Sequence, residues 1–388
     1  MKHAASLGDL TAQTFLKRYW QKSPHLIRKA FPQIISPISA EELAGLACET
    51  GVESRLVIKT RGKPGWQVRH GPFKEKDFRT LPKKNWTLLV QDTDKHLPEL
   101  ADFLTHFYFI PTWRIDDLMI SFAADGGSVG PHIDAYDVFL LQVQGQRRWS
   151  ISQKHHAQVL NPGFELSQIR KFKPQHTWLL EPGDMLYLPP GVAHHGIAAG
   201  ECMTFSIGFR APADAEMLAD LSTLLLTRLD KEKRYTDSDL MPAQMNPGLI
   251  TNKARTAIRK RMCNTIRLSP GELDEWFGCF ITEPKPWLVP GPARRSLTPA
   301  ALQPKLFKHK KLVRDPAVNI AWYETRSHQI KLFVNGRCHI LPAGLSGFAM
   351  TLCGQRIYNA SVLARWLRNR HAINLLTEMY NQGLLYFP

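Results

Sequence analysis

Six short apolar runs between residues 88 and 209 restrict the folds that are open to the first half of the protein. Each run is bounded by Gly, Pro or Asp, a pattern typical of short strands joined by tight turns. Many such strands favour a sandwich or a barrel, here of the jelly-roll type. The runs are LLV at 88–90, DDLMISF at 116–122, DVFLLQV at 137–143, RRWSIS at 147–152, DMLYLPP at 184–190 and MTFSIGF at 203–209.

The pattern becomes helical after Pro212. One face of a predicted helix carries five apolar residues: Met217, Leu218, Leu221, Leu225 and Leu229. A basic, helical stretch follows to about residue 280, and five prolines between residues 284 and 299 indicate a linker. Beyond the linker, residues 320–340 predict a hairpin that turns at Asn335-Gly336, and residues 361–383 predict further helix.

Positive charge is concentrated in the last third of the sequence. Residues 1–250 hold 29 Lys and Arg against 27 Asp and Glu, whereas residues 251–388 hold 21 against 7. Such a surface is either a soluble basic face or a contact for an anionic partner, most plausibly RNA. The basic residues expected to contact phosphate are Lys331, Arg337, Arg365, Arg368 and Arg370.

Cysteine usage and hydropathy favour a cytoplasmic protein. The six cysteines show no C-x-x-C pairing, which argues against a zinc ribbon or a disulfide framework and fits a reduced compartment. We expect no membrane-spanning helix, because no run of about 18 apolar residues exists. The first residues, MKHAASLGDLTAQ, lack the apolar core of a signal peptide.

Two separated segments carry residues that ligate metals. His132 and Asp134 lie two positions apart, so in a strand both side chains point to the same side. His194 and His195 follow the Pro-Pro-Gly turn at 189–191, and either one can complete a triad of two histidines and one carboxylate. Non-haem Fe(II) oxygenases use such a triad. The alternatives are a polar strand edge and a surface pair of histidines.

An arginine near these ligands suggests a second function for the site. Arg147 follows a predicted turn at Gly145, begins the next strand and can face the same cavity, whereas Arg148 would face outward. A guanidinium group suits the distal carboxylate of 2-oxoglutarate, because it donates two parallel hydrogen bonds. The alternative is a solvated arginine at a strand edge.

Together these segments resemble the bacterial JmjC-type ribosomal oxygenases, most densely over residues 15–215. The resemblance also includes WQKSP, ISAEELAGLA, VESRLV, NWTLLVQ and GFRAP. It implies an α+β protein with a double-stranded β-helix (jelly-roll, cupin-like) catalytic domain, a helical dimerisation segment and a C-terminal winged-helix domain. The expected bounds are 1–212, 213–283 and 305–388, with the Pro-rich linker at 284–304.

The resemblance also implies an activity and its residues. Members use Fe(II), O2 and 2-oxoglutarate to hydroxylate an arginine of large-subunit ribosomal protein sixteen, and animal relatives hydroxylate histidines of other ribosomal proteins. Carried over position by position, the metal ligands fall on His132, Asp134 and His194, and the 2-oxoglutarate arginine falls on Arg147. Ser121 is a further expected contact to the same carboxylate. His195 departs from the family, in which a carboxylate is common at this position.

Substrate contacts and alternative activities complete the sequence-based expectations. Asp125, Tyr136 and Asp137 flank the first metal ligands and are candidates to bind the target arginine, although turn formation or strand-edge solvation explains them equally well. The expected partners are a large-subunit ribosomal protein, a second copy of the protein itself and ribosomal RNA, with no membrane. A JmjC demethylase, a metal-dependent cupin isomerase and an assembly factor without oxygenase activity are the alternatives.

Overall fold

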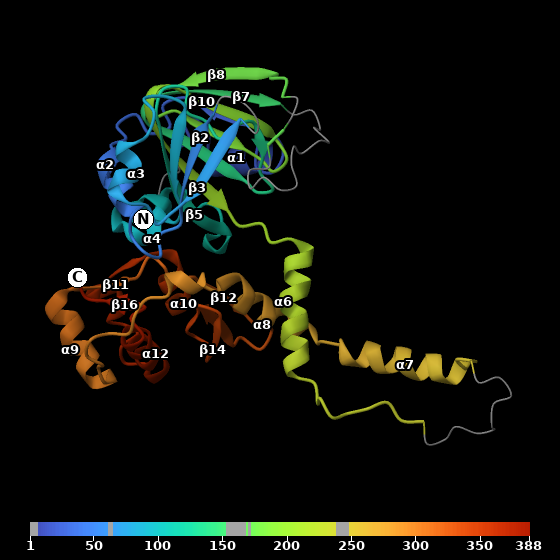
Figure 1. Ribbon diagram of the computed structural model, residues 1–388. Coiled ribbons are helices and arrows are strands. Elements are labelled where there is room, and N and C mark those ends of the chain that lie inside the picture. The colour runs from blue at the N-terminus through green and yellow to red at the C-terminus, as the bar shows by residue number, and fades with distance from the viewer. Residues whose placement is uncertain (1–6, 61–64, 153–167, 170–171, 238–247) are drawn as a thin grey trace.

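The computed structural model describes residues 7–60, 65–152, 168–169, 172–237 and 248–388, which form a β-rich body, a projecting helical arm and a C-terminal module (Figure 1). The body contains one antiparallel ten-stranded sheet in the order β1-β9-β7-β10-β5-β4-β2-β3, with β6 paired to β10 and β8 paired to β7. Its strands are β1 (His25–Ile27), β2 (Ser54–Lys59), β3 (Trp66–His70), β4 (Trp86–Val90), β5 (Ile115–Ala123), β6 (His132–Ile133), β7 (Val138–Ser152), β8 (His176–Leu180), β9 (Met185–Leu188) and β10 (Ala193–Phe209).

Each predicted run contributes to a strand of this sheet, although DMLYLPP extends beyond β9 at both ends, and two of the runs belong to one strand. DVFLLQV and RRWSIS are both part of β7, so the predicted turn at Gly145 is wrong. Gly145 has φ +63° and faces a register shift in β10 between Ala199 and Met203. A Cβ at this position would lie 2.1 Å from the carbonyl oxygen of Glu201, so only glycine permits the close approach of the two backbones.

Short helices and aromatic side chains cover one face of the sheet, opposite the face that carries Trp149. Phe15 of α1 packs edge-on against Tyr187 of β9, with ring centroids 4.9 Å apart, and Phe107 packs against Phe139 of β7 at 5.2 Å. All four residues are almost completely buried, so they anchor the N-terminal helices to the barrel. The helices are α1 (Ala12–Arg18), α2 (Ala40–Leu46), α3 (Glu75–Arg79), α4 (Thr93–His96) and α5 (Pro98–Phe103), with 3₁₀ turns at Leu104–Phe107 and Thr112–Arg114.

The C-terminal module has its own apolar core and two three-stranded sheets, β15-β11-β16 and β12-β13-β14. The predicted hairpin turn is confirmed: Asn335 and Gly336 have φ of +45° and +77°, as the tight turn between β13 and β14 requires. The elements are α8 (Pro270–Thr282), η3 (Pro286–Leu288), α9 (Pro299–His309), β11 (Lys311–Arg314), β12 (Ile320–Glu324), β13 (Ile330–Val334), β14 (Arg337–Leu341), α10 (Ser346–Gly354), β15 (Ile357–Asn359), α11 (Ala360–Leu363), α12 (Arg370–Asn381) and β16 (Leu385–Tyr386).

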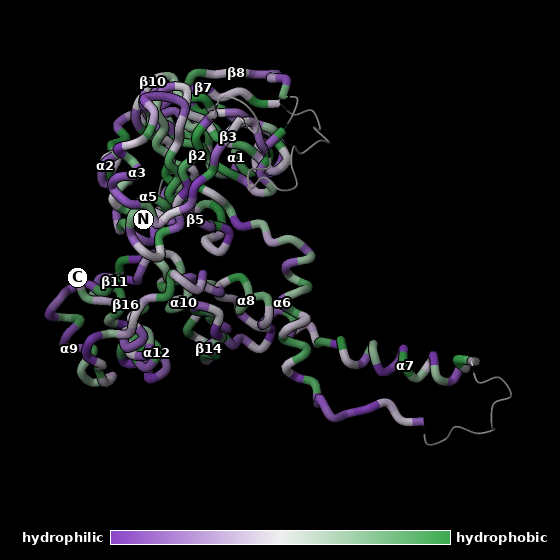
Figure 2. The backbone as a smooth tube through the Cα atoms, in the orientation of Figure 1, coloured by the Kyte–Doolittle hydropathy of each residue, from purple (hydrophilic) through white to green (hydrophobic). Residues whose placement is uncertain are grey.

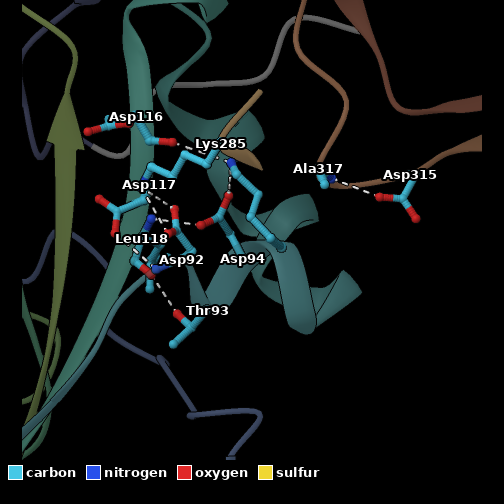
Figure 3. Close-up of polar contacts among 10 residues, drawn as sticks. Asp92, Thr93, Asp94, Asp116, Asp117, Leu118, Lys285, Asp315 and Ala317 are labelled. Carbon is cyan, nitrogen blue, oxygen red and sulfur yellow. Dashed lines mark hydrogen bonds and ion pairs between the residues drawn. The ribbon is translucent and has the colours of Figure 1, made fainter. Parts of the chain in front are cut away.

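Two ion pairs join this module to the barrel. Lys285 Nζ lies 2.8 Å from both carboxylate oxygens of Asp92, whose own backbone N–H donates to Asp117 (Figure 3). Arg356 donates to Asp102 through Nε at 2.9 Å and Nη2 at 2.6 Å. Asp92 and Arg356 are buried, so these contacts fix the module against one end of the barrel.

The helical arm consists of α6 (Asp214–Thr227) and α7 (Asn252–Thr265) and has no buried residue within either helix. Helix α6 contacts α8 through Trp276, whose indole N–H donates to Asp220 at 2.6 Å, and α7 projects away from both globular parts (Figure 1). Hydrophilic and hydrophobic residues alternate along α7 (Figure 2). Among the described residues, no helix is both long and apolar enough to cross a membrane.

Candidate metal and co-substrate site

Three side chains from adjacent elements converge inside the barrel. His132 of β6 and His194 of β10 are register partners, and Asp134 follows β6 directly. The carboxylate of Asp134 lies 3.8 Å from Nε2 of His132 and 3.4 Å from Nε2 of His194. One ligand atom from each residue lies within 4.8 Å of the other two, so all three can reach a single ion. Two imidazole nitrogens and one carboxylate oxygen match the ligand set of non-haem Fe(II) oxygenases.

Backbone carbonyl groups orient both imidazole rings toward this centre. Nδ1 of His132 lies 3.0 Å from the carbonyl oxygen of Gly130, and Nδ1 of His194 lies 3.0 Å from that of Val192. A carbonyl oxygen only accepts, so each Nδ1 carries the hydrogen and each Nε2 presents a lone pair to the centre. Burial, with the nearby His132, lowers the pKa of His194 to about 4, which keeps the ring neutral and able to bind metal at neutral pH.

The structure distinguishes the two neighbouring histidines. His194 is 2% exposed and belongs to the convergent group, whereas His195 is partly exposed and its ring lies edge-on to Phe172 at 6.0 Å. Successive residues of a strand face opposite sides, which is why only one of the pair reaches the centre.

Arg147 lies beside the three ligands as a buried cation. It is 3% exposed, its Nη1 donates to Ser121 Oγ at 3.2 Å, and its Nε has no hydrogen-bond partner within the described structure. No described carboxylate forms an ion pair with it. Burial lowers the pKa of its guanidinium group, so the charge carries a desolvation cost that an anionic ligand would offset. Arg148, the next residue, is exposed, as strand parity predicts.

Trp149 is a site residue that sequence reasoning missed. The guanidinium group of Arg147 lies 5.1 Å above its ring, and the ring centroid is 5.8 Å from that of His194. Opposite Trp149 on β10 stands Gly196, where a Cβ would lie 2.7 Å from Arg147 Nε and from the indole ring. The alternation of side chains along a strand could have predicted this residue, because Trp149 is two residues beyond Arg147 and both therefore point into the barrel.

The three candidate substrate residues lie in different environments. Tyr136 is 44% exposed and lines a cavity of about 640 Å³ between the barrel and the C-terminal module. Asp125 lies at the surface, where it pairs with Lys84 at 2.8 Å and accepts from the backbone N–H of Gly200. Asp137 is fully buried and accepts hydrogen bonds from Tyr187, Gln21 and Arg114, a geometry that favours its structural role over contact with a substrate.

The cavity beside Tyr136 has an acidic wall. Asp92, Asp94 and Asp116 line it, and Asp117 lies buried behind them (Figure 3). Burial raises the pKa of Asp117 to about 7, and the nearby carboxylates of Asp116, Asp92 and Asp94 add to the shift. Lys285 pairs with Asp92 and Lys95 with Asp94, and both lysines line the same cavity, so the fold itself balances much of this acidic charge.

Two family models match the protein in regions that agree with this architecture. Residues 102–217 match the JmjC domain, and residues 262–386 match the ROXA-like winged helix. The ribosomal protein uL16 3-hydroxylase of Escherichia coli is 40% identical over 300 residues, which cover 77% of this chain and 79% of that protein. A Haemophilus influenzae protein named "Probable ribosomal oxygenase" is 40% identical over 218 residues, which cover 55% of this chain and 53% of that protein.

Solved structures extend this similarity over nearly the whole length. A crystal structure of the E. coli ribosomal oxygenase YcfD superimposes with a TM-score of 0.83 at 34% identity and covers 98% of this chain and 99% of that one. A second YcfD structure, in complex with cobalt and 2-oxoglutarate, gives a TM-score of 0.81 over 98% of both chains at 34% identity.

The sequence identity to these relatives, the share of each chain that is covered and the architecture of the solved structures thus agree. The protein belongs to the JmjC-domain ribosomal oxygenases, the family that includes the ribosomal protein uL16 3-hydroxylase of E. coli.

Proposed function

We propose that this protein is an Fe(II)- and 2-oxoglutarate-dependent hydroxylase that acts on an arginine side chain of the large-subunit ribosomal protein uL16. The observation that carries the proposal is the convergence of His132, Asp134 and His194 beside the buried Arg147, which has no carboxylate partner among the described residues. Membership of the uL16 3-hydroxylase family supplies the substrate class.

The residues of the site fit the metal and its co-substrate. His132, Asp134 and His194 would hold Fe(II) on one face and leave positions open on the other. Bound iron with 2-oxoglutarate and O2 supplies the oxidising chemistry that turns a C–H bond of the target residue into C–OH, with succinate and CO2 as the other products. The protein itself contributes two imidazole rings that backbone carbonyl groups orient toward the carboxylate of Asp134.

Arg147 would bind the distal carboxylate of 2-oxoglutarate, with Ser121 as its neighbour. Its free Nε and the fixed plane of the guanidinium group, held over Trp149, favour two-point recognition of a carboxylate. Ser121 Oγ accepts from Arg147 Nη1 at 3.2 Å and donates a long hydrogen bond of 3.5 Å to the carbonyl oxygen of Thr204, which it would exchange for a bond to the same anion.

Tyr136 is the substrate candidate that the geometry supports best. It follows the ligand Asp134 by two residues, is 44% exposed and lines the cavity next to the C-terminal module, so its hydroxyl group is open to a substrate. Asp125 remains a candidate at the rim, although its carboxylate is engaged by Lys84 and Gly200.

Arginine is favoured over histidine as the target. The uL16 3-hydroxylase is 40% identical to this protein. The Aedes aegypti protein that is named as a histidyl-hydroxylase and lysine-specific demethylase is less similar, at 23% identity.

A homodimer in the cytoplasm is the proposed physiological form. Leu218 of α6 and Leu229, two residues beyond the end of this helix, belong to the predicted apolar face and are 63% and 40% exposed in the single protomer. Pairing with a second copy would remove this surface from water. The basic C-terminal third would contact ribosomal RNA in the same compartment.

Metal binding tests the assignment of the three ligands. His194→Ala should abolish Co(II) binding and succinate formation, because it removes one of three ligands, while His195→Ala should retain one bound metal per protomer. Both variants should stay folded, because the aromatic core of the barrel is untouched. Metal content after dialysis and circular dichroism provide the measurements. Equal metal loss in the two variants would contradict the assignment.

A matched pair of arginine variants tests the co-substrate contact. Arg147→Met should raise the concentration of 2-oxoglutarate needed for half-maximal turnover far more than Arg148→Met. Loss of a buried charge pair costs about 2–5 kcal/mol, a factor of roughly tens to thousands in affinity. Initial rates of succinate formation at varied 2-oxoglutarate measure the difference, and similar effects of both substitutions would refute the proposed contact.

Mass spectrometry tests the substrate directly. Incubation of a uL16 peptide with the protein, Fe(II), 2-oxoglutarate and O2 should add one oxygen atom to an arginine residue. Fragmentation spectra locate the oxygen, and a peptide with that arginine replaced by lysine serves as the control. Placement of the oxygen on histidine would select the alternative activity.

Light scattering tests the homodimer. At micromolar concentration the wild-type protein should show twice the protomer mass of 44.2 kDa. Leu218→Asp should shift it to the monomer, because the change buries a charge in the apolar contact. Thr223→Asp adds the same charge on another side of α6 and should leave the dimer intact. A monomeric wild-type protein would exclude this assembly.

A further inference from the structure

Helix α7 forms without help from the protein core. Thr251 caps it by accepting a hydrogen bond from the backbone N–H of Ala254, yet none of its fourteen residues is buried. Isolated helices of this length are marginally stable in water, because packing of an apolar face supplies most helical stability in proteins. Contacts with other molecules are therefore expected to stabilise α7.

The charges of α7 reinforce this expectation. Six Lys and Arg residues and no Asp or Glu occur between Thr251 and Leu268. The first turn contains no acidic residue, so positive charge stands where the helix dipole favours negative charge. Arg255 and Arg259 are four residues apart on the helix, a like-charge spacing that is itself destabilising. A nearby anion would relieve both effects.

The helix has two distinct faces. At 100° per residue, Ala254, Ile258 and Met262 lie along one side, and Ile258 and Met262 are 43% and 53% exposed. By the same count Lys260 lies opposite that side and Arg259 on its flank, and Arg267 follows the C-cap Ile266 just beyond the helix. All three are exposed, and none forms an ion pair with a carboxylate in the described structure. We call Arg259, Lys260 and Arg267 the α7 basic face.

Several other basic residues of the C-terminal third are neutralised within the fold. Lys331 pairs with Glu275 at 2.6 Å, Lys285 with Asp92 at 2.8 Å, and Arg356 with Asp102 at 2.6 Å. The α7 basic face has no such internal counter-charge in the described residues, so its charge is available to a partner.

We propose that the α7 basic face binds the sugar-phosphate backbone of RNA. Arg and Lys are the side chains that contact phosphate most readily, and such contacts need no base sequence. The face spans about 12 Å along the helix, enough for more than one phosphate. The identification of the anion as RNA rests on the proposed function, because an enzyme of a ribosomal protein works beside ribosomal RNA.

The apolar side of α7 argues against a membrane as the partner. Helices that lie in a lipid interface present Trp, Phe or Leu on the apolar face, and α7 presents only Ala254, Ile258 and Met262 there. Coverage of this side by a second copy, in the dimer proposed above, would leave the basic face directed outward.

Fluorescence anisotropy with a labelled single-stranded oligouridylate of about 20 nucleotides tests the proposal. Replacement of Arg259, Lys260 and Arg267 by Gln should weaken binding at least about tenfold near 0.1 M salt, and should reduce the slope of log K against log salt by about two, since each phosphate contact contributes about 0.7. The control variant replaces Arg337, Arg368 and Arg370 of the winged helix by Gln, three residues that the sequence alone suggested as phosphate contacts. It loses the same charge and should bind almost as tightly as wild type, because the proposal assigns the contact to α7.

Three results would overturn the α7 proposal: no binding of the wild-type protein at low salt, an equal or larger loss in the winged-helix control, or equally tight binding to polyglutamate or to phosphatidylglycerol vesicles. Light scattering confirms that both variants keep the wild-type oligomeric state. Succinate formation with the uL16 peptide is measured in parallel. RNA binding through α7 without peptide hydroxylation would refute the proposed activity alone, and hydroxylation without RNA binding would refute the docking surface alone.

Discussion

The antiparallel pairing of β7 with β10 is the constraint on which the site depends. This register sets Ala198 opposite Arg147 and Gly196 opposite Trp149, so that two small residues leave room for two large ones, and it sets Ile151 opposite His194. The neighbours of β10 then add the remaining groups: β6 pairs His132 with His194, and β5 pairs Ser121 with Thr204. A slip of one residue would turn every one of these side chains to the opposite face.

Much of this arrangement could be predicted from the sequence, because strands alternate strictly and ligand types are few. The period of two placed His132 with Asp134 and separated Arg147 from Arg148. The choice of His194 over His195 needed the family resemblance, because the sequence does not show which of two neighbouring strand residues points toward His132 and Asp134. Gly145 was misjudged because a glycine that accommodates a close backbone approach has the same local sequence signal as a turn glycine.

Other features depend on contacts between residues far apart in sequence, which no local pattern reveals. Asp137 looked like an exposed neighbour of the ligands, but Tyr187 and Gln21 enclose it from fifty and more than a hundred residues away. The net charge of the C-terminal third could be counted from the sequence, but not which of its cations are neutralised. Arg356 and Lys331, for example, form ion pairs with carboxylates that are far away in the sequence. Helix α7 differs, because the residues of its basic face form no ion pair with any other element in the described structure.

The burial of Arg147 affects both the stability of the fold and the affinity of the site for an anion. A buried guanidinium group with an unsatisfied Nε destabilises the single protomer, because water no longer solvates the charge. The long pairing of β7 with β10 and the contact with Trp149 keep the group in place despite that cost. An anion that enters then gains the full attraction of a fixed, poorly solvated cation without reorganising it. The same burial that lowers the stability of the barrel would therefore favour the binding of a carboxylate at Arg147, as proposed above.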